Sequence, residues 1–270
     1  MIKTILARLQ QGHRTTKYPR GPAPELSARF RGLPVIAPTA CPAGCEACIE
    51  TCPTGAIEAT GHVALDLGKC LFCGECETSC PAGAIAFSRD HRLATSHRED
   101  LVLSGGELRR AEAMSRDLRR LQGRSLKLRV VSAGGCNACE ADVNVLFTVG
   151  WDLGRFGVQV VASPRHADAL LVTGPVTGNM RLALQKTWEA VPAPKLVIAV
   201  GACAISGGPY VGHPEQHDGA ASTVPVHLFI PGCPPHPLTI LDGLLRLLGR
   251  LPEPAPALPP AGVAQGGPTY

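Results

Sequence analysis

The chain has 270 residues, of which 45% are hydrophobic and 18% charged, and this composition excludes disorder over its full length. At roughly 100–200 residues per domain, two domains are expected. No apolar run reaches the roughly 18 residues that a transmembrane helix needs. Lys3 and Arg8 interrupt the short apolar stretch at the start, which argues against a secretory signal peptide.

Residues 1–38 predict a basic N-terminal helix and arm. Large apolar residues recur there at helical spacing: Ile2, Ile5, Leu6 and Leu9. This amphipathic helix suits packing on its own domain and docking on a partner or membrane surface equally well. The formal charge of the whole chain is only +4, but residues 1–35 hold seven Lys or Arg against Glu25 alone. That asymmetry favours a docking arm, and we expect no nucleic-acid partner.

Residues 39–88 contain an internal repeat, CPAGCEACIETCPTGAI at 41–57 and CLFCGECETSCPAGAI at 70–85, which predicts a duplicated small domain. The second run has the C-x2-C-x2-C-x3-C-P spacing of two-cluster 4Fe-4S ferredoxins, in which the fourth cysteine ligates the other cluster. A pair of zinc sites is the alternative. On the ferredoxin interpretation the first cluster takes Cys41, Cys45, Cys48 and Cys80. The second takes Cys70, Cys73, Cys76 and Cys52.

Residues 89–125 are expected to form a linker with a helix. A capping box at Ser104 and Glu107 predicts the start of that helix. One apolar face follows at Leu108, Ala111, Met114, Leu118 and Leu121. Because the other face is rich in Arg, we expect a solvated connector.

Residues 126–250 alternate apolar strands with helical stretches, which predicts a parallel sheet covered on both faces. Expected strands lie at 128–131, 158–162, 169–174, 195–201 and 224–230. Expected helices lie near 138–149, 178–190 and 238–249. The fold class is therefore α/β, with a duplicated two-cluster ferredoxin-like domain followed by a flavodoxin-like parallel-sheet domain. Residues 251–270 are expected to be a disordered tail.

The last four of the 12 cysteines are Cys136, Cys139, Cys203 and Cys233. Three of them directly follow predicted strands, and the carboxyl ends of parallel strands share one sheet edge, where ligands bind. Four buried small hydrophobic residues are the alternative. Without a secretory signal the disulfides of these cysteines would be reduced, so we expect three 4Fe-4S clusters that together use every cysteine.

The segments CNACEADVN, SPRHADALLVTGPVTGNM, AVGACAISGGPY and IPGCPPHP resemble the small-subunit family shared by NiFe hydrogenases and the cluster-bearing 20 kDa subunit of respiratory NADH:quinone oxidoreductase. Residues 1–88, with RGLPVI before the first cysteine, are similar to the two-cluster ferredoxin subunit of the same complexes. The chain thus looks like a fusion of two neighbours. The C-x-x-C pattern of Cys136 and Cys139 resembles the hydrogenase side of the family, because quinone-reducing members carry adjacent cysteines there.

The resemblance implies an electron-transfer subunit of a membrane-associated NiFe hydrogenase of the formate-hydrogenlyase or energy-converting type. It also implies an oxidoreductase whose catalytic centre lies in a NiFe-bearing large subunit, next to the C-terminal cluster. Further expected partners are membrane-embedded subunits, with a formate dehydrogenase or a ferredoxin as candidate donor. The expected location is the inner face of the cytoplasmic membrane. The alternatives are a quinone-linked complex and a stand-alone ferredoxin-type redox protein.

Four other residues have open roles. The resemblance places Arg165, His166 and Asp168 near the subunit interface and the cluster, while an Arg–Asp pair that organises a turn is the alternative. Glu140 suits proton relay, contact with the large subunit, or simple capping. The HPEQH segment at 213–217 departs from the HExxH zinc motif, and the chain lacks both the P-loop and the G-x-G-x-x-G patterns, which disfavours nucleotide binding.

Overall fold

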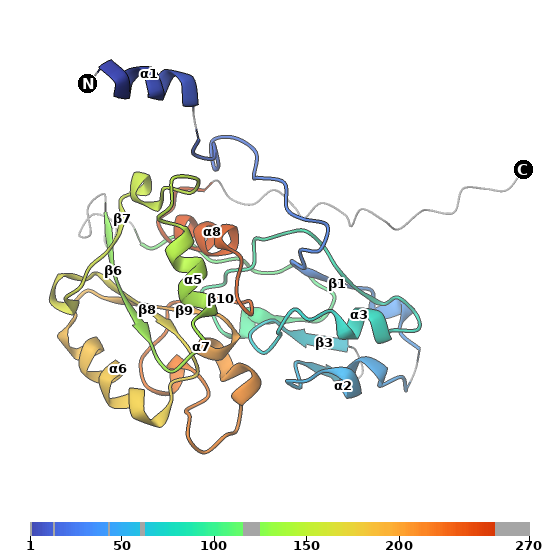
Figure 1. Ribbon diagram of the computed structural model, residues 1–270. Helices are drawn as coiled ribbons and strands as arrows, with labels where there is room; N and C mark the ends of the chain where they lie inside the picture. The colour runs from blue at the N-terminus through green and yellow to red at the C-terminus, as the bar shows by residue number, and fades with distance from the viewer. Residues whose placement is uncertain (1, 13, 43, 60–62, 116–124, 252–270) are drawn as a thin grey trace, which may run out of the picture.

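The computed structural model describes residues 2–12, 14–42, 44–59, 63–115 and 125–251. The N-terminal cysteine repeat forms one part of the body, and a parallel sheet with its helices forms the other (Figure 1). No described helix has the length and apolar character needed to cross a membrane.

The repeat folds as two matching units of a short helix followed by a strand. Its helices are α2 (Ala47–Thr51) and α3 (Glu75–Ser79). The strands of this N-terminal part are β1 (Pro34–Ile36), β2 (Ile57–Ala59), β3 (Val63–Asp66), β4 (Ile85–Phe87) and β5 (Val102–Leu103), of which β1 and β5 flank the repeat. β1 pairs with β4, and β3 lies between β2 and β5, all antiparallel. Leu65, Leu67 and Leu101 are fully buried in one core.

The C-terminal part has a five-stranded parallel sheet in the order β10-β9-β8-β6-β7. Its strands are β6 (Leu126–Ser132), β7 (Val158–Val160), β8 (Ala169–Thr173), β9 (Leu196–Val200) and β10 (Leu228–Ile230). Its helices are α5 (Ala138–Val145), α6 (Gly178–Ala190), α7 (Ala202–Ser206) and α8 (Pro237–Leu247). Counted in chain order within the sheet, the strand order is 2-1-3-4-5, which is the flavodoxin-like order and confirms the predicted fold class.

Both faces of this sheet are covered, as the unbroken apolar strands predict. Leu171 of β8 packs into the core shared with α5 and α8, whereas its neighbours Leu170 and Val172 pack into the core shared with α6. Figure 1 shows these helices on opposite sides of the sheet. Short 3-10 turns lie at Pro38–Ala40, Glu99–Leu101, Leu153–Phe156, Pro164–His166, Gly208–Tyr210 and Ala220–Ser222.

The prediction of a solvated helix starting at Ser104 is wrong for residues 104–115, which contain no helix. Leu108, Ala111 and Met114 are buried, and the backbone N–H groups of Ala111 and Met114 donate to the carbonyls of Ala94 (2.7 Å) and Leu247 (2.9 Å). Tertiary backbone bonds therefore replace helical ones, and the apolar positions at intervals of three face the core without a helix. Residues 116–124, and residues 252–270 of the tail predicted at 251–270, lie outside the described residues.

The two parts share one packed interface. Thr95 and Phe229 exchange both backbone hydrogen bonds, at 3.0 and 2.9 Å, so the segment after β4 covers the open edge of β10. The Ser206 hydroxyl at the end of α7 donates to the carbonyl of Gly68 at 2.8 Å. Ile205 and Phe229 belong to the same core as Leu65. The cysteine repeat is thereby held in a fixed position against the carboxyl edge of the sheet.

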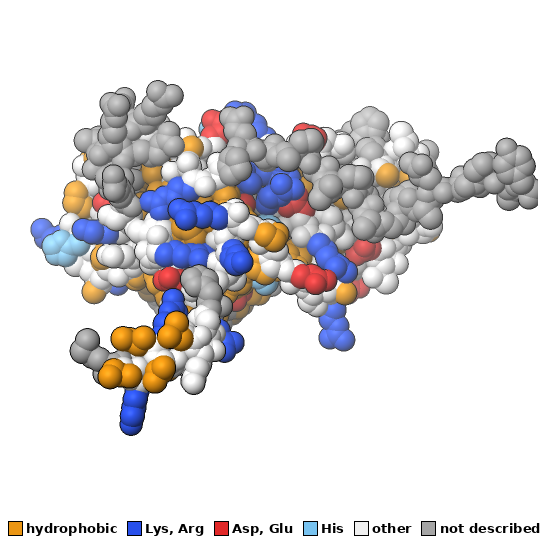
Figure 2. Space-filling view, turned by 90° about the horizontal axis from the view of Figure 1, so that it is seen from above, with side chains coloured by type: hydrophobic (Ala, Val, Ile, Leu, Met, Phe, Trp, Pro, Cys, Tyr) orange, Lys and Arg blue, Asp and Glu red, His pale blue; other side chains and the backbone are white. Residues whose placement is uncertain are grey.

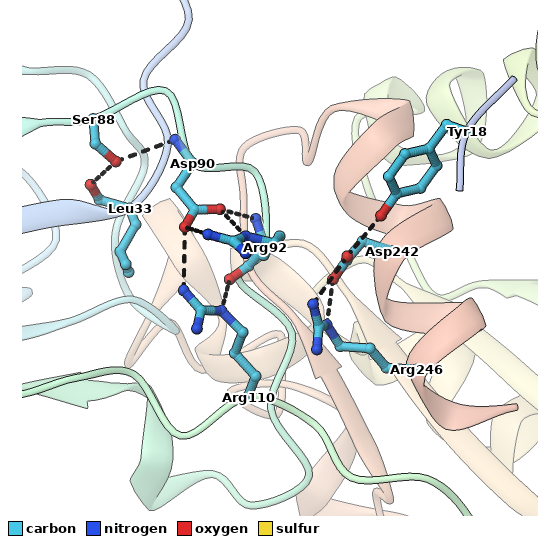
Figure 3. Close-up of polar contacts among 8 residues, drawn as sticks. All are labelled: Tyr18, Leu33, Ser88, Asp90, Arg92, Arg110, Asp242 and Arg246. Carbon is cyan, nitrogen blue, oxygen red and sulfur yellow. Dashed lines mark hydrogen bonds and ion pairs between the residues drawn. The ribbon is translucent and has the colours of Figure 1, made fainter. Parts of the chain in front are cut away.

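Two carboxylates hold the peripheral segments with Arg partners (Figure 3). Asp90 accepts from Arg92 at 2.7 Å and from Arg110 at 3.1 Å, which ties the segment near 110 to the one after β4. Asp242 of α8 accepts from Arg246 at 2.6 Å and from the Tyr18 hydroxyl at 3.0 Å. Asp242 is fully buried, so its hydrogen bond with Tyr18 anchors the N-terminal arm to α8.

Helix α1 (Ile2–Gln11) stands away from the body, and none of its residues is buried (Figure 1). Of the two interpretations of this helix, packing on its own domain is therefore wrong.

Candidate iron–sulfur centres

The first predicted cysteine set lies around one cavity with an empty volume of about 270 Å³. The cavity is lined by Cys41, Cys45, Cys48 and Cys80, and its apolar walls include Val63 and Ile85. Cys80 comes from the second repeat and the other three come from the first. The folded repeat thus brings together the four residues that the spacing assigns to one cluster.

Backbone amides point at the sulfur of Cys80. Ala84 N–H donates to Cys80 Sγ at 3.2 Å. Burial raises the pKa of the Cys80 thiol, but the N–H groups of residues 82–85 outweigh burial and hold it below its ordinary value. Amides that stabilise a thiolate suit a metal ligand, because the thiolate is the ligating form.

The second set surrounds a separate cavity with an empty volume of about 320 Å³, lined by Cys52, Cys70, Cys73 and Cys76. Ala56 N–H donates to Cys52 Sγ at 3.2 Å, and Phe72 N–H donates to Cys70 Sγ at 3.3 Å. Phe72 has φ +55°, a left-handed conformation that turns its amide toward the sulfur.

Burial dominates the chemistry of this second set. Burial, with a smaller contribution from neighbouring sulfurs, raises the pKa of Cys70 to about 12 against the lowering effect of the Phe72 amide, and that of Cys76 to about 11. These thiols therefore stay protonated without metal, and loading the site must release protons. Four thiols that line one cavity suit a multi-iron cluster better than a single zinc ion, which draws four ligands to within about 2.3 Å of one point. No three His, Cys, Asp or Glu side chains of the described residues surround a single-ion position.

The third set lies at the carboxyl edge of the parallel sheet, as the strand pattern predicts. Cys136 follows β6, Cys139 lies in α5, Cys203 lies in α7 after β9, and Cys233 follows β10. The pKa of Cys139 is raised to about 12, mainly by burial. Smaller contributions come from the charges of Cys203, Glu140, Cys233 and Cys136. Burial likewise raises the pKa of Cys203 to about 11, with Cys233 and Cys136 next. The four side chains therefore lie close enough to influence one another electrostatically.

Two glycines allow this approach. Gly201 has φ +89°, and a Cβ there would lie 2.5 Å from Cys139 Sγ. Gly208 has φ +55°, and its Cβ would lie 3.0 Å from Cys203 Sγ. Side chains at these positions would be strained and would also fill the space beside the sulfurs.

The third set is more open than the other two. Cys203 is buried, but Cys136 and Cys233 are exposed. Cys233 also lines a groove of about 760 Å³ together with Leu71 and Phe72, the two residues between Cys70 and Cys73. The second and third sets are therefore neighbours across this groove, while α2 and α3 bring the first and second sets together.

Glu140 points back toward the sheet. Its carboxylate accepts from the Thr173 hydroxyl at 2.7 Å. Burial raises the pKa of Glu140, but hydrogen bonds from Ser132 and Thr173 outweigh burial and keep the pKa below its ordinary value. Glu140 thus links α5 to the ends of β6 and β8.

The expectation that Arg165, His166 and Asp168 lie near the cluster is wrong. These residues precede β8, so they lie at the amino edge of the sheet, opposite the cysteines. Asp168 accepts from the backbone N–H of Lys127 at 2.7 Å and thereby fixes the start of β6. In the HPEQH segment, His213 Nδ1 accepts from Glu215 N–H at 3.2 Å, which is a local turn contact.

Sequence reasoning missed two features. Asp242 and Arg246 are an i,i+4 pair inside an otherwise apolar helical run, and that pair was a readable signal of a buried ion pair. Arg31 lies over the backbone at Gly74, directly after Cys73, and a Cβ at Gly74 would collide with its guanidinium. No local pattern predicts this second contact.

Residues 136–247 match the family described as NADH ubiquinone oxidoreductase, 20 Kd subunit, and residues 40–84 match the 4Fe-4S dicluster domain. The chain is 40% identical over 150 residues to a probable membrane-bound hydrogenase subunit of Pyrococcus furiosus, a match that covers 56% of this chain and 90% of that protein. The chain therefore belongs to the 20 kDa subunit family. The resemblance seen in the sequence is confirmed.

Two further members of the 20 kDa subunit family show its range. Formate hydrogenlyase subunit 7 of Escherichia coli is 44% identical over 123 residues, which covers 46% of this chain but only 48% of that protein. An NADH-quinone oxidoreductase subunit of Heliobacterium modesticaldum is 36% identical over 124 residues, which covers 46% of this chain and 71% of that protein. A chain in the structure of an archaeal membrane-bound sulfane sulfur reductase is 31% identical, with a TM-score of 0.44, and covers 50% of this chain and 75% of that one.

Proposed function

We propose that the chain is the electron-transfer subunit of a membrane-associated NiFe hydrogenase of the formate-hydrogenlyase or energy-converting type, and that it holds three 4Fe-4S clusters. The observation that carries the proposal is the serial placement of the three cysteine sets. The first two share the helix pair α2 and α3, and the last two share the groove between Phe72 and Cys233.

The two cavities of the repeat support the first two ligand assignments, and the place of the last four cysteines at the carboxyl edge of the sheet supports the third. Cys41, Cys45, Cys48 and Cys80 hold one cluster, and Cys52, Cys70, Cys73 and Cys76 hold the second. The third is held by Cys136, Cys139, Cys203 and Cys233. When bound, such clusters accept and release one electron each, over a range of potentials that spans about −700 to +450 mV.

The residues around the sulfurs position and insulate these sites. Amides at Ala56, Phe72 and Ala84 donate to sulfur and stabilise its negative charge. Mainly apolar side chains line the first two cavities. The third set lacks such a lining at Cys136 and Cys233, so a partner must cover it. The NiFe-bearing large subunit is the proposed cover, and its active site would exchange electrons with this set.

The C-x-x-C spacing of Cys136 and Cys139 favours the hydrogenase assignment. The family also includes quinone-linked subunits, as the Heliobacterium relative shows, so a quinone-linked complex is the second candidate. In the proposed complex the chain lies peripherally on the inner face of the membrane, next to membrane-embedded subunits. A formate dehydrogenase or a ferredoxin is the proposed electron donor.

Hydrogen-driven reduction of the assembled complex tests the proposal. Under hydrogen, we expect electron paramagnetic resonance signals from reduced clusters in this chain. In the Cys203→Ser complex, hydrogen should no longer reduce the clusters of the repeat, whereas dithionite still should. Equal reduction of those clusters by hydrogen in both complexes would refute the serial route, and a wild-type complex inert to hydrogen would refute the hydrogenase assignment.

A further inference from the structure

The apolar face of α1 has no partner within the described chain. The exposed fractions of Ile2, Ile5, Leu6 and Leu9 are 76%, 57%, 51% and 73%. Four large side chains on one helical face are costly to leave in water, at up to about 1.5–3 kcal/mol each. Such a contiguous exposed face marks an interaction surface.

The charges around this face are of one sign. At 3.6 residues per turn, Lys3 and Arg8 flank the apolar face on its two sides, and the remaining positions of the helix are Thr, Ala and Gln. Arg14, Lys17 and Arg20 follow, all exposed, and the first acidic residue of the chain is Glu25. Figure 2 shows the hydrophobic side chains of α1 gathered together, with Lys and Arg spread over the neighbouring face of the body.

The arm fixes where this helix can lie. Thr16 N–H donates to Gly150 carbonyl at 2.8 Å, and Arg155 donates to the carbonyls of Thr16 (2.6 Å) and Tyr18 (2.7 Å). With Tyr18 bonded to Asp242, the chain is anchored within a few residues of the end of α1. The helix is therefore tethered within a few residues of the segment near 149.

That neighbouring segment extends the apolar surface. Thr15 donates to the Val149 carbonyl at 2.9 Å, and the Val149 side chain is 69% exposed. Phe147 is exposed by 41%. Apolar side chains with basic residues on both flanks fit a bilayer interface, where the apolar face enters the acyl boundary and the Lys and Arg side chains reach acidic headgroups.

We propose that α1 lies flat on an anionic lipid bilayer and that the anchored arm orients the body with its segment near 149 toward the membrane. The flanking charges favour anionic lipid as the occupant, because a zwitterionic surface would leave Lys3, Arg8 and the arm cations without counter-charge. The inference names lipid as the membrane contact and rests on the proposed peripheral location, although it does not require a hydrogenase large subunit.

Co-sedimentation of the full, cluster-loaded chain with vesicles tests this inference. Binding is expected to vesicles of phosphatidylcholine with phosphatidylglycerol, and to weaken with salt because the Debye length is only about 8 Å at 0.15 M. The Ile5→Gln, Leu9→Gln double variant should lose at least about tenfold in affinity. Lys3→Gln and Arg8→Gln should each lose about fivefold.

The matched control is the Thr4→Gln, Gln11→Ser double variant, which changes the polar face alone and should bind as the wild type does. All variants should keep the iron content of the wild type, because α1 contacts no cysteine cavity. Failure of the wild type to bind the anionic vesicles, or equal binding by the Ile5→Gln, Leu9→Gln variant, would overturn the lipid contact and point to a protein partner. Vesicle binding without hydrogen-driven reduction would refute the proposed function and leave this inference standing.

Discussion

Arg31 places a positive charge beside the second cysteine set. Its guanidinium packs over Gly74, the residue after Cys73. A nearby cation stabilises the more negative, reduced form of a cluster, so the Arg31→Gln substitution should lower the reduction potential of the cluster in the second set. A redox titration followed by electron paramagnetic resonance measures this shift cluster by cluster.

Arg31→Lys is the control for that shift, because it keeps the charge and changes the shape. We expect its reduction potential to stay near the wild-type value. An equal drop in Arg31→Lys and Arg31→Gln would show that packing over Gly74, rather than charge, sets the potential.

His91, which packs against Tyr18 of the N-terminal arm, makes the folding stability of the chain pH-dependent. Its ring packs edge-on against Tyr18 with centroids 5.9 Å apart, and its Nε2 atom is buried without a hydrogen-bond partner among the described residues. Burial lowers the pKa of His91, against the opposing charges of Asp242 and Asp90. The unfolded chain therefore binds this proton more readily, and folded stability falls as the pH drops below about 6.5.

The His91→Phe variant keeps an aromatic ring at this position and removes the titratable imidazole. Its melting temperature should fall less than that of the wild type between about pH 7.5 and pH 5.5. Thermal melts of the loaded chain followed by circular dichroism measure the difference. His227 and His236 also have pKa values lowered by burial, so part of the wild-type slope should remain in the variant. Parallel slopes in the two proteins would exclude His91 as the source.

At the scale of elements, the turn from β9 into α7 sets the shape of the third site. Gly201→Ala would place a methyl group 2.5 Å from Cys139 Sγ at a φ of +89°. We expect this variant to lose the third cluster and to retain the two clusters of the repeat. Iron analysis with spectroscopy of each cluster measures the loss. Gly150→Ala is the control, since a Cβ there meets nothing within 4 Å. Full iron content in Gly201→Ala would contradict the close packing inferred at this turn.

Most elements of the sheet could be predicted because strands such as β8 and β9 are buried along their whole length and read as unbroken apolar runs. The absence of a helix at 104–115 could not be predicted, because the capping box and the apolar spacing that suggest a helix there are local signals. The backbone N–H groups of Ala111 and Met114 donate instead to the carbonyls of Ala94 and Leu247. Both acceptors are far from their donors in sequence, so no local pattern reveals them. The position of Arg165 was misjudged from resemblance, although its place before β8 already put it at the amino edge.

At the scale of the whole molecule, the sequence predicted which cysteines meet but not how the two parts join. Strand order and cysteine spacing follow repeating rules, so three ligand sets could be proposed from them. The interface between the two parts depends on single pairings such as Thr95 with Phe229 and Ser206 with Gly68. No periodicity encodes these contacts, because each depends on the final fit of two surfaces.

This interface determines the spacing of the proposed redox sites, because it places the second cysteine set across a groove from the third. A continuous series of redox sites needs all three sets to be filled in one chain. Anaerobic iron and acid-labile sulfide analysis of the purified full chain is therefore the most direct test. The account predicts about twelve iron and twelve sulfide per chain, four of each for every cysteine set. A value of about eight, with the missing cluster assigned to the set at Cys136 and Cys203 by spectroscopy, would contradict it.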